Sequence, residues 1–296
     1  MIFKGAATAL VTPFNNGKVD FEKYGELIDW QIKEGIQGIV TCGTTGEGAT
    51  LNDKEHKEVI KFCVEKVDGR VPVIAGTGSN DTEYGLQLSQ YADKVGVDAL
   101  MMVTPYYNKT TQKGLVKHYQ YLANNVEKPI ILYNVPSRTG LKMDVDTVVE
   151  LSKHPRIAAL KDATGDIVYT ADLISKISGN DFVVYSGNDD MIIPILSLGG
   201  VGVISVLSNV LPFETQKMVE KYLLGETEEA RMMQLDLMDF IHNLFIETNP
   251  IPVKTALNCM GHKVGGFRLP LCEMAPENEI KLREAMNRIG LKVVKE

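Results

Sequence analysis

The sequence predicts an α/β protein built as a (β/α)8 barrel with a C-terminal helical extension. Three observations support this fold class: eight short, continuously apolar segments, amphipathic helical segments between them, and helical patterns alone after about residue 210. Continuous apolar runs are typical of strands that are covered on both faces. Serial alternation of strands and helices is typical of parallel sheets, and the 296 residues suit one barrel with an appendage.

The eight apolar segments are the expected strands. Most of them start 25–33 residues apart, with a shorter final step, which is the spacing of serial βαβ units. They cover residues 6–13, 38–43, 71–78, 99–105, 129–136, 157–163, 182–188 and 200–206. An open doubly wound sheet is the main alternative. However, TPFNNG follows the first strand, where such a sheet usually carries a G-x-G-x-x-G loop.

Helical patterns fill the intervals between these strands. The first expected helix has one apolar face, formed by Phe21, Tyr24, Leu27, Ile28 and Ile32. Asn52 followed by Glu55 resembles a capping box, and Asn80 followed by Glu83 repeats that signal. Thr110 is the expected cap of the helix after the fourth strand.

No strand is expected after about residue 210. Segments 212–224, 227–246, 250–261 and 276–290 have helical patterns. The first of them would complete the barrel, and the others would pack beside it. We therefore expect a catalytic barrel over residues 1–224 and a C-terminal helical domain over residues 225–296.

Composition excludes several classes of protein. Hydrophobic residues make up 44% and charged residues 23%, which is an ordinary globular profile. The net charge of −7 and the pI of about 5.4, without a basic stripe, give no support to nucleic-acid binding. No apolar run reaches 18 residues, so no membrane span is expected, and the short apolar N-terminus is interpreted as the first strand and not as a signal peptide.

The cysteines indicate a reducing compartment. Cys42, Cys63, Cys259 and Cys272 are scattered without a CxxC spacing, and the first two lie in segments expected to be core. This scatter does not resemble a disulfide framework, so free thiols are the expected state. Free thiols are typical of reducing compartments. The expected location is therefore the cytoplasm.

Lys161 is the first candidate catalytic residue. In a (β/α)8 barrel the active site lies at the C-terminal ends of the strands. The apolar run 157–160 leads directly into Lys161, which closes the sixth strand at that end. Burial disfavours the ammonium form, and a neutral amine can attack a carbonyl to form an imine. The alternative is a structural lysine paired with Asp162 or another carboxylate, and the residue alone does not decide between them.

Two tyrosines and a threonine could move protons in such chemistry. Tyr133 ends the fifth strand, next to the lysine's strand, and a phenol in a hydrogen-bond network can act as a general acid and base. Tyr107 and Thr44 lie at neighbouring strand ends and could complete the network. The simpler interpretation is that these tyrosines pack with their hydroxyl groups in solvent.

Carboxylate-binding groups are also present at the strand ends. The GTTGE loop, residues 43–47, offers backbone N–H groups and two hydroxyl groups, although a plain turn would look the same. Arg138, in SRTG after the fifth strand, offers a bidentate fork for a carboxylate. More commonly, an arginine in such a loop is simply exposed to solvent and binds no ligand.

Neither a metal nor a phosphate site is expected. The histidines form no HxH or HExxH pair, so a metal-dependent aldolase is disfavoured. No P-loop is present, and the loop LSNVLP after the last strand is not a glycine-rich phosphate cradle. A phosphorylated substrate is therefore disfavoured.

The motifs at successive strand ends match a known family. GTTGE, PYYN, YNVPSRTG, LKDATGD and YSGND follow one another in that order over nearly the whole chain. The combination resembles the class I, pyruvate-dependent aldolases and, within them, the dihydrodipicolinate synthase family. This resemblance implies condensation of pyruvate with L-aspartate 4-semialdehyde in lysine and diaminopimelate biosynthesis. It implies no cofactor beyond the covalent imine.

The resemblance also assigns roles to residues. Lys161 would form the Schiff base with pyruvate, and Tyr133 would relay protons together with Thr44 and Tyr107. In the family this second tyrosine comes from a neighbouring subunit, and the usual assembly is a homotetramer, a dimer of dimers. The expected substrate-binding residues are Thr45 for the pyruvate carboxylate, Arg138 for the semialdehyde carboxylate, and Gly187 and Ile204 through backbone groups.

Two features distinguish between branches of the family. N-acetylneuraminate lyases usually carry Ser-Thr where this chain has Thr44-Thr45, and they lack the arginine of SRTG. Both features favour the synthase branch. Other class I pyruvate aldolases, either N-acetylneuraminate lyases or keto-sugar-acid aldolases, stay as the alternative enzymes, and a ligand-binding barrel without turnover stays as the non-enzymatic alternative.

The sequence also bears on feedback inhibition by lysine. Positions of the family's lysine site are found at Ala49, His56, Asn80 and Tyr106. Other positions differ, since Tyr84 stands where the family has an acidic residue, Asp53 replaces a histidine or polar residue, and Gly48 replaces a common serine. We therefore predict weak or absent inhibition by lysine.

Overall fold

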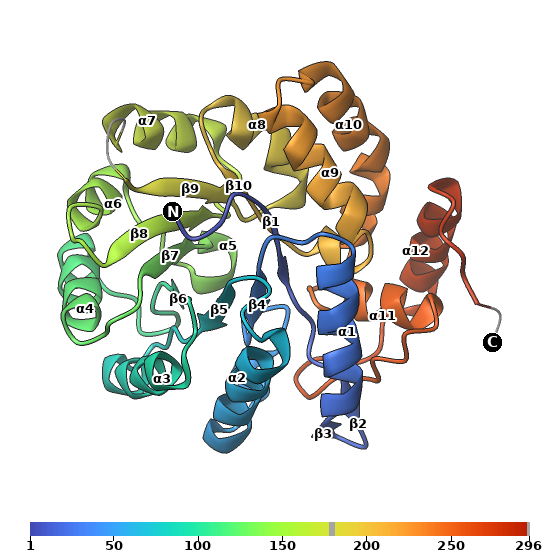
Figure 1. Cartoon of the computed structure of the whole chain (residues 1–296), viewed down its shortest axis with the longest axis horizontal. Helices are drawn as coiled ribbons and strands as arrows, with labels where there is room; N and C mark the ends of the chain where they lie inside the picture. Colours follow the sequence, from blue (N-terminus) through green and yellow to red (C-terminus); the bar gives the residue numbers. More distant parts are fainter. Residues whose placement is uncertain (178–180, 295–296) are drawn as a thin grey trace.

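A closed barrel of parallel strands forms the centre of the computed structural model, which describes residues 1–177 and 181–294 (Figure 1). Neighbouring strands in the barrel follow the order β1-β10-β9-β8-β7-β6-β5-β4. Their bounds are β1 Gly5–Ala9, β4 Ile39–Thr41, β5 Val73–Gly76, β6 Ala99–Val103, β7 Ile130–Asn134, β8 Ile157–Asp162, β9 Val183–Ser186 and β10 Gly202–Ser205. All eight predicted strands are confirmed, each shorter than its apolar segment.

Helices surround the barrel (Figure 1). Those that alternate with the strands are α1 Phe21–Lys33, α2 Asp53–Val67, α3 Thr82–Val95, α4 Gln112–Asn124, α6 Val145–Leu151, α7 Ile167–Ile177, α8 Ile192–Ser197 and α9 Pro212–Leu223. Short turns of helix follow several strands: η1 Gly48–Thr50, α5 Pro136–Thr139, η2 Asp189–Met191 and η3 Leu207–Asn209. The antiparallel pair β2 Phe14–Asn15 and β3 Lys18–Val19, which the sequence did not predict, follows β1.

One predicted helix start is confirmed and two are wrong by one residue. The capping box at Asn52 forms, because its Oδ1 accepts from the Glu55 amide at 3.0 Å and Glu55 Oε2 accepts from the Asn52 amide at 3.2 Å. Asp81, not Asn80, caps α3, and Thr111, not Thr110, caps α4. In both cases two adjacent residues offer a suitable acceptor, and the later one reaches the free amides of the first turn.

The buried residues form two clusters, one inside the barrel and one between the barrel and the helices. This arrangement shows to which side Lys161 points. On β7, Tyr133 belongs to the cluster inside the barrel, whereas Leu132 packs between barrel and helices. On β8, Ala159 is inside and Leu160 outside. Because side chains alternate along a strand, Lys161 points into the barrel with Ala159.

The C-terminal helices are α10 Thr227–Asn243, α11 Ile251–Cys259 and α12 Pro276–Arg288, as the sequence predicts. Figure 1 shows α10 and α12 at the side of the molecule where α9 lies. The domain boundary at residues 224 and 225 stays a prediction. Within the described ranges, no helix is long and apolar enough to cross a membrane.

A buried ion pair joins α11 to the loop after β4. Lys254 Nζ lies 2.8 Å from Glu47 Oε1, and both side chains are fully buried. The same ammonium donates to the carbonyl oxygens of Thr12, at 3.1 Å, and Gly266. Glu47 adopts a left-handed backbone conformation with φ of 52°. The pair therefore holds the GTTGE loop from a segment more than two hundred residues away.

We expect Lys254→Met to destabilise the protein by roughly 3–5 kcal/mol, because it leaves the Glu47 carboxylate buried without its partner. The free energy of unfolding in urea would measure this loss. The double variant Lys254→Met, Glu47→Gln should recover part of it, since no charge is then left unpaired. Unfolding of the single variant at the wild-type urea concentration would contradict the assignment.

Candidate active site

Lys161 lies inside the barrel and is almost shielded from water. Its side chain is 5% exposed, and its Nζ lies 4.4 Å from the centre of the Tyr133 ring, on the neighbouring strand. The pKa of Lys161 is lowered to about 8, chiefly by burial; the charge of Asp189 opposes this shift and that of Arg138 adds to it. The neutral amine is thus accessible near neutral pH.

The geometry does not support a structural ion pair between Lys161 and Asp162. Asp162 points to the helical layer, where Oδ2 accepts from Thr170 Oγ1 at 2.5 Å and Oδ1 from the Thr164 amide at 2.9 Å. Among the described residues, the Lys161 ammonium makes neither a hydrogen bond nor a salt bridge. A buried amine without a fixed partner is suited to chemistry rather than to structure.

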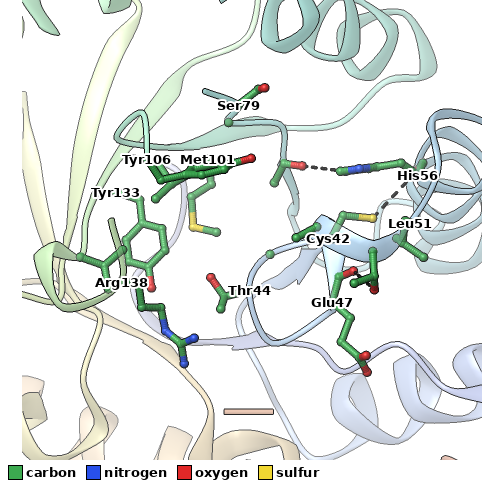
Figure 2. Close-up of a pocket in the computed structure, with 18 of the residues that line it drawn as sticks. Cys42, Thr44, Glu47, Leu51, His56, Ser79, Met101, Tyr106, Tyr133 and Arg138 are labelled. Carbon is green, nitrogen blue, oxygen red and sulfur yellow. Dashed lines mark hydrogen bonds between the residues drawn. The ribbon is translucent and has the colours of Figure 1, made fainter. Parts of the chain in front are cut away.

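Tyr133, Thr44 and Arg138 share one cavity with a volume of about 420 Å³. Figure 2 shows the Tyr133 hydroxyl, the Thr44 hydroxyl and the Arg138 guanidinium directed toward the same space. Burial raises the pKa of Tyr133, whereas Arg138 and Thr44 lower it. Arg138 and Thr44 thus favour the phenolate, but in one chain burial outweighs them.

Lys161 borders this cavity through the Tyr133 ring and is not among the described residues that line it. Gly187 packs against the lysine, since a Cβ at this position would lie 3.1 Å from Lys161 Cγ and 2.8 Å from Ala163 Cβ. A larger residue at Gly187 would therefore press on the backbone of β8 and on the Lys161 side chain. Ile204 is fully buried inside the barrel on β10, in the same cluster as Tyr133.

Asn249, which the sequence analysis did not single out, connects the two expected carboxylate sites. Its Nδ2 donates to Thr45 Oγ1 at 3.0 Å, and its carbonyl oxygen accepts from Arg138 Nη2 at 3.1 Å. Asn249 precedes Pro250 and α11, and it lines the cavity. The Asn-Pro step is a weak turn signal in the sequence, and nothing in the pattern indicates a contact with residues so distant along the chain.

Tyr107 does not join Tyr133 and Thr44 within one chain. Its side chain is 92% exposed, and its backbone has a left-handed conformation with φ of 68°. The adjacent Tyr106 lines the cavity instead. Tyr107 is not among the described residues that line the cavity, and its part in the network, from a neighbouring subunit, stays a prediction.

Three of the four candidate lysine-site residues border the same cavity. Ala49, His56 and Tyr106 line it, and Asn80 is not among its described lining residues. His56 is buried with Nε2 at 2.9 Å from the Gly76 carbonyl oxygen, and burial lowers its pKa. The carbonyl oxygen of Asn80 accepts from Asn108 Nδ2 at 2.9 Å. A role for these residues in inhibition stays a prediction.

In the described part of the chain, no group of three or more His, Cys, Asp or Glu side chains is arranged to hold a metal ion. The candidate site consists of an amine, two hydroxyl groups and a guanidinium. Such groups are suited to carbonyl addition and to the binding of carboxylates.

Comparison with known proteins gives a consistent result. A model of the "Dihydrodipicolinate synthetase family" matches residues 2–289. The 4-hydroxy-tetrahydrodipicolinate synthase of Thermoanaerobacter sp. (strain X514) is 55% identical over 291 residues, 98% of each chain. That of Acetivibrio thermocellus is 52% identical over 290 residues, again 98% of each chain.

Solved structures agree with this result. The dihydrodipicolinate synthase of Aquifex aeolicus has a TM-score of 0.96 at 44% identity and covers 99% of this chain and 100% of its own. That of Thermotoga maritima has a TM-score of 0.96 at 40% identity, with 98% of this chain and 100% of its own covered.

Proposed function

This chain belongs to the dihydrodipicolinate synthetase family of lyases, and we propose that it condenses pyruvate with L-aspartate 4-semialdehyde through an imine at Lys161. In that role it would act as a 4-hydroxy-tetrahydrodipicolinate synthase in lysine and diaminopimelate biosynthesis, in the cytoplasm. The observation that carries the proposal is a buried, unpaired lysine with a lowered pKa beside the Tyr133 ring.

The first half of the reaction builds a nucleophilic carbon. The neutral Lys161 amine attacks the ketone carbon of pyruvate, and loss of water from the carbinolamine leaves a protonated imine. The imine nitrogen withdraws electrons, so the methyl group can release a proton and form an enamine. Thr45, whose hydroxyl oxygen accepts from Asn249, would donate a hydrogen bond from that hydroxyl to the pyruvate carboxylate.

The second half joins the two substrates and frees the lysine. The enamine carbon attacks the aldehyde carbon, whose oxygen takes up a proton to become a hydroxyl group. The amino group of the semialdehyde then attacks the imine carbon and displaces Lys161 as the ring closes. Tyr133 is the phenol within reach of these proton transfers, and Arg138 would hold the semialdehyde carboxylate.

Arg138→Lys tests the assignment of the aldehyde subsite. We expect KM for the semialdehyde to rise roughly 10- to 150-fold, because lysine keeps the charge but loses the bidentate fork. Steady-state kinetics with the semialdehyde varied at saturating pyruvate would measure the change. Trapping of pyruvate on the variant should stay near the wild-type level. An unchanged KM would place the semialdehyde carboxylate elsewhere.

The exposed Tyr107 supports a homodimeric unit, within the homotetramer that the family resemblance implies. Tyr107 is 92% exposed and directly follows Tyr106, which lines the cavity, so it is suited to enter a second copy's site and complete the Tyr133–Thr44 network. Sedimentation analysis would show the assembly. An active monomer would contradict a contribution from the partner.

Turnover with defined substrates tests the proposed function. Pyruvate should be consumed with L-aspartate 4-semialdehyde, at a kcat/KM well above the values for keto-sugar acids or N-acetylneuraminate cleavage. Preference for a sugar acid would move the protein to another class of pyruvate aldolase. Binding without turnover of any of these substrates would favour the ligand-binding barrel.

We expect weak or absent inhibition by lysine, because Tyr84 stands where the lysine-binding members carry an acidic residue. A dose–response curve of initial rates against lysine concentration would measure this. Strong suppression at sub-millimolar lysine would contradict the prediction.

A further inference from the structure

Asp189 is a buried carboxylate beside the lysine that the mechanism above does not use. It begins η2, directly after the turn that follows β9, and is 2% exposed. Two residues earlier, Gly187 packs against the Lys161 side chain, and Tyr185 on β9 pairs in register with Lys161 on β8. The segment that carries Asp189 thus runs past Lys161 at the mouth of the barrel.

The carboxylate of Asp189 is anchored on several sides. Oδ1 accepts from Ser205 Oγ at 2.6 Å, and Oδ2 accepts from the amides of Val206 at 3.0 Å and Leu207 at 2.9 Å. Its carbonyl oxygen accepts from Gln234 Nε2 of α10 at 3.0 Å. Burial raises the pKa of Asp189, and the hydrogen bonds and Lys161 oppose that shift. The donors hold the carboxylate in place and favour its charged form.

Two charges act on the Lys161 nitrogen, and they have opposite signs. Asp189 favours a positive charge there, and Arg138 disfavours it. Asp189 nevertheless forms no direct salt bridge with Lys161 among the described side chains. A direct salt bridge would occupy the nitrogen and keep it as an ammonium. A fixed charge at a longer distance leaves the nitrogen free to react and still acts on the positive imine.

We propose that Asp189 is a positioning residue of the imine chemistry: its anchored carboxylate is the counter-charge that favours the protonated imine of Lys161 and pyruvate. The inference rests on the proposed function and adds a residue to it. The proposal also explains the hydrogen bonds from Ser205 and Gln234 to Asp189. They hold in place a charge that acts on Lys161 and does not contact the substrate.

Asp189→Asn removes the charge and keeps the size of the side chain. We expect the midpoint of the pH dependence of pyruvate trapping by borohydride to move down by roughly one unit, because nothing then favours the ammonium form against Arg138. The pyruvate concentration that gives half-maximal trapping should rise roughly tenfold, because one pH unit corresponds to a tenfold change in an equilibrium constant. A purely structural role would change the yield of folded protein without moving the midpoint.

Asp162→Asn is the matched control. Asp162 is also 2% exposed and hydrogen-bonded, but it faces α7 and does not act on Lys161. Its variant should keep the wild-type midpoint. An unmoved midpoint in Asp189→Asn, or an equal shift in Asp162→Asn, would overturn the proposal.

Ser205→Ala covers the case in which Asp189→Asn does not fold. Loss of one donor makes the Asp189 carboxylate easier to protonate, so the midpoint should move in the same direction by a smaller amount. A folded Ser205→Ala protein with an unmoved midpoint would count against the proposal. Failure of the proposed function would look different, because the wild-type protein itself would then form no adduct at Lys161.

Discussion

Lys161→Ala should lower kcat/KM for the condensation by on the order of 10³-fold or more, because the variant lacks the amine that carries the proposed imine. Lys161 is the described lysine that points into the barrel beside the cavity, and its side chain has no structural partner to lose. The folded state should therefore survive the substitution. Initial rates of pyruvate consumption with the semialdehyde would measure the effect.

Two controls make the Lys161 result specific. Lys161→Arg keeps a cation at the position but cannot form the imine, so it should be as inactive as the alanine variant. Lys153→Ala removes a lysine whose side chain is 66% exposed and should keep wild-type rates. Substantial activity in either Lys161 variant would exclude the imine mechanism.

Tyr133→Phe should lower kcat by about 10²- to 10⁴-fold, the usual contribution of a positioned acid and base. The phenyl ring still packs against Lys161 Nζ, so the pyruvate adduct should form, although more slowly. Steady-state kinetics combined with trapping of pyruvate would separate the two effects.

Tyr169→Phe is the matched control for Tyr133. Tyr169 is another buried tyrosine, but its hydroxyl lies 3.1 Å from Asn134 Nδ2 in the outer layer. This variant should keep kcat near the wild-type value. A Tyr133→Phe enzyme as fast as Tyr169→Phe would remove Tyr133 from the proton relay.

The fold could be predicted from the sequence because its strands are buried on both faces. Continuous apolar runs marked all eight barrel strands, and the capping box at Asn52 marked a helix start. The caps of α3 and α4 were misplaced, because two neighbouring residues offered equivalent acceptors. The pair β2–β3 was missed, since each strand has only two residues and shows no periodicity.

Only those residues of the candidate site that lie at the ends of strands could be predicted from the sequence. Lys161 and Tyr133 lie at or near the ends of β8 and β7, and the structure brings them together because these strands are neighbours in the barrel. Asn249 and Lys254 reach the site from the C-terminal segment, and no local pattern reports contacts over such sequence distances. Asp189 lies within the YSGND motif, but its relation to Lys161 depends on the packing of η2.

Borohydride reduction in the presence of pyruvate, followed by intact-mass and peptide-mass analysis, tests the central claim most directly. The account predicts one reduced pyruvyl group per chain, located on Lys161, because this lysine combines burial, a lowered pKa and a free nitrogen. No adduct, or an adduct on another lysine, under conditions that label a known pyruvate aldolase, would contradict it.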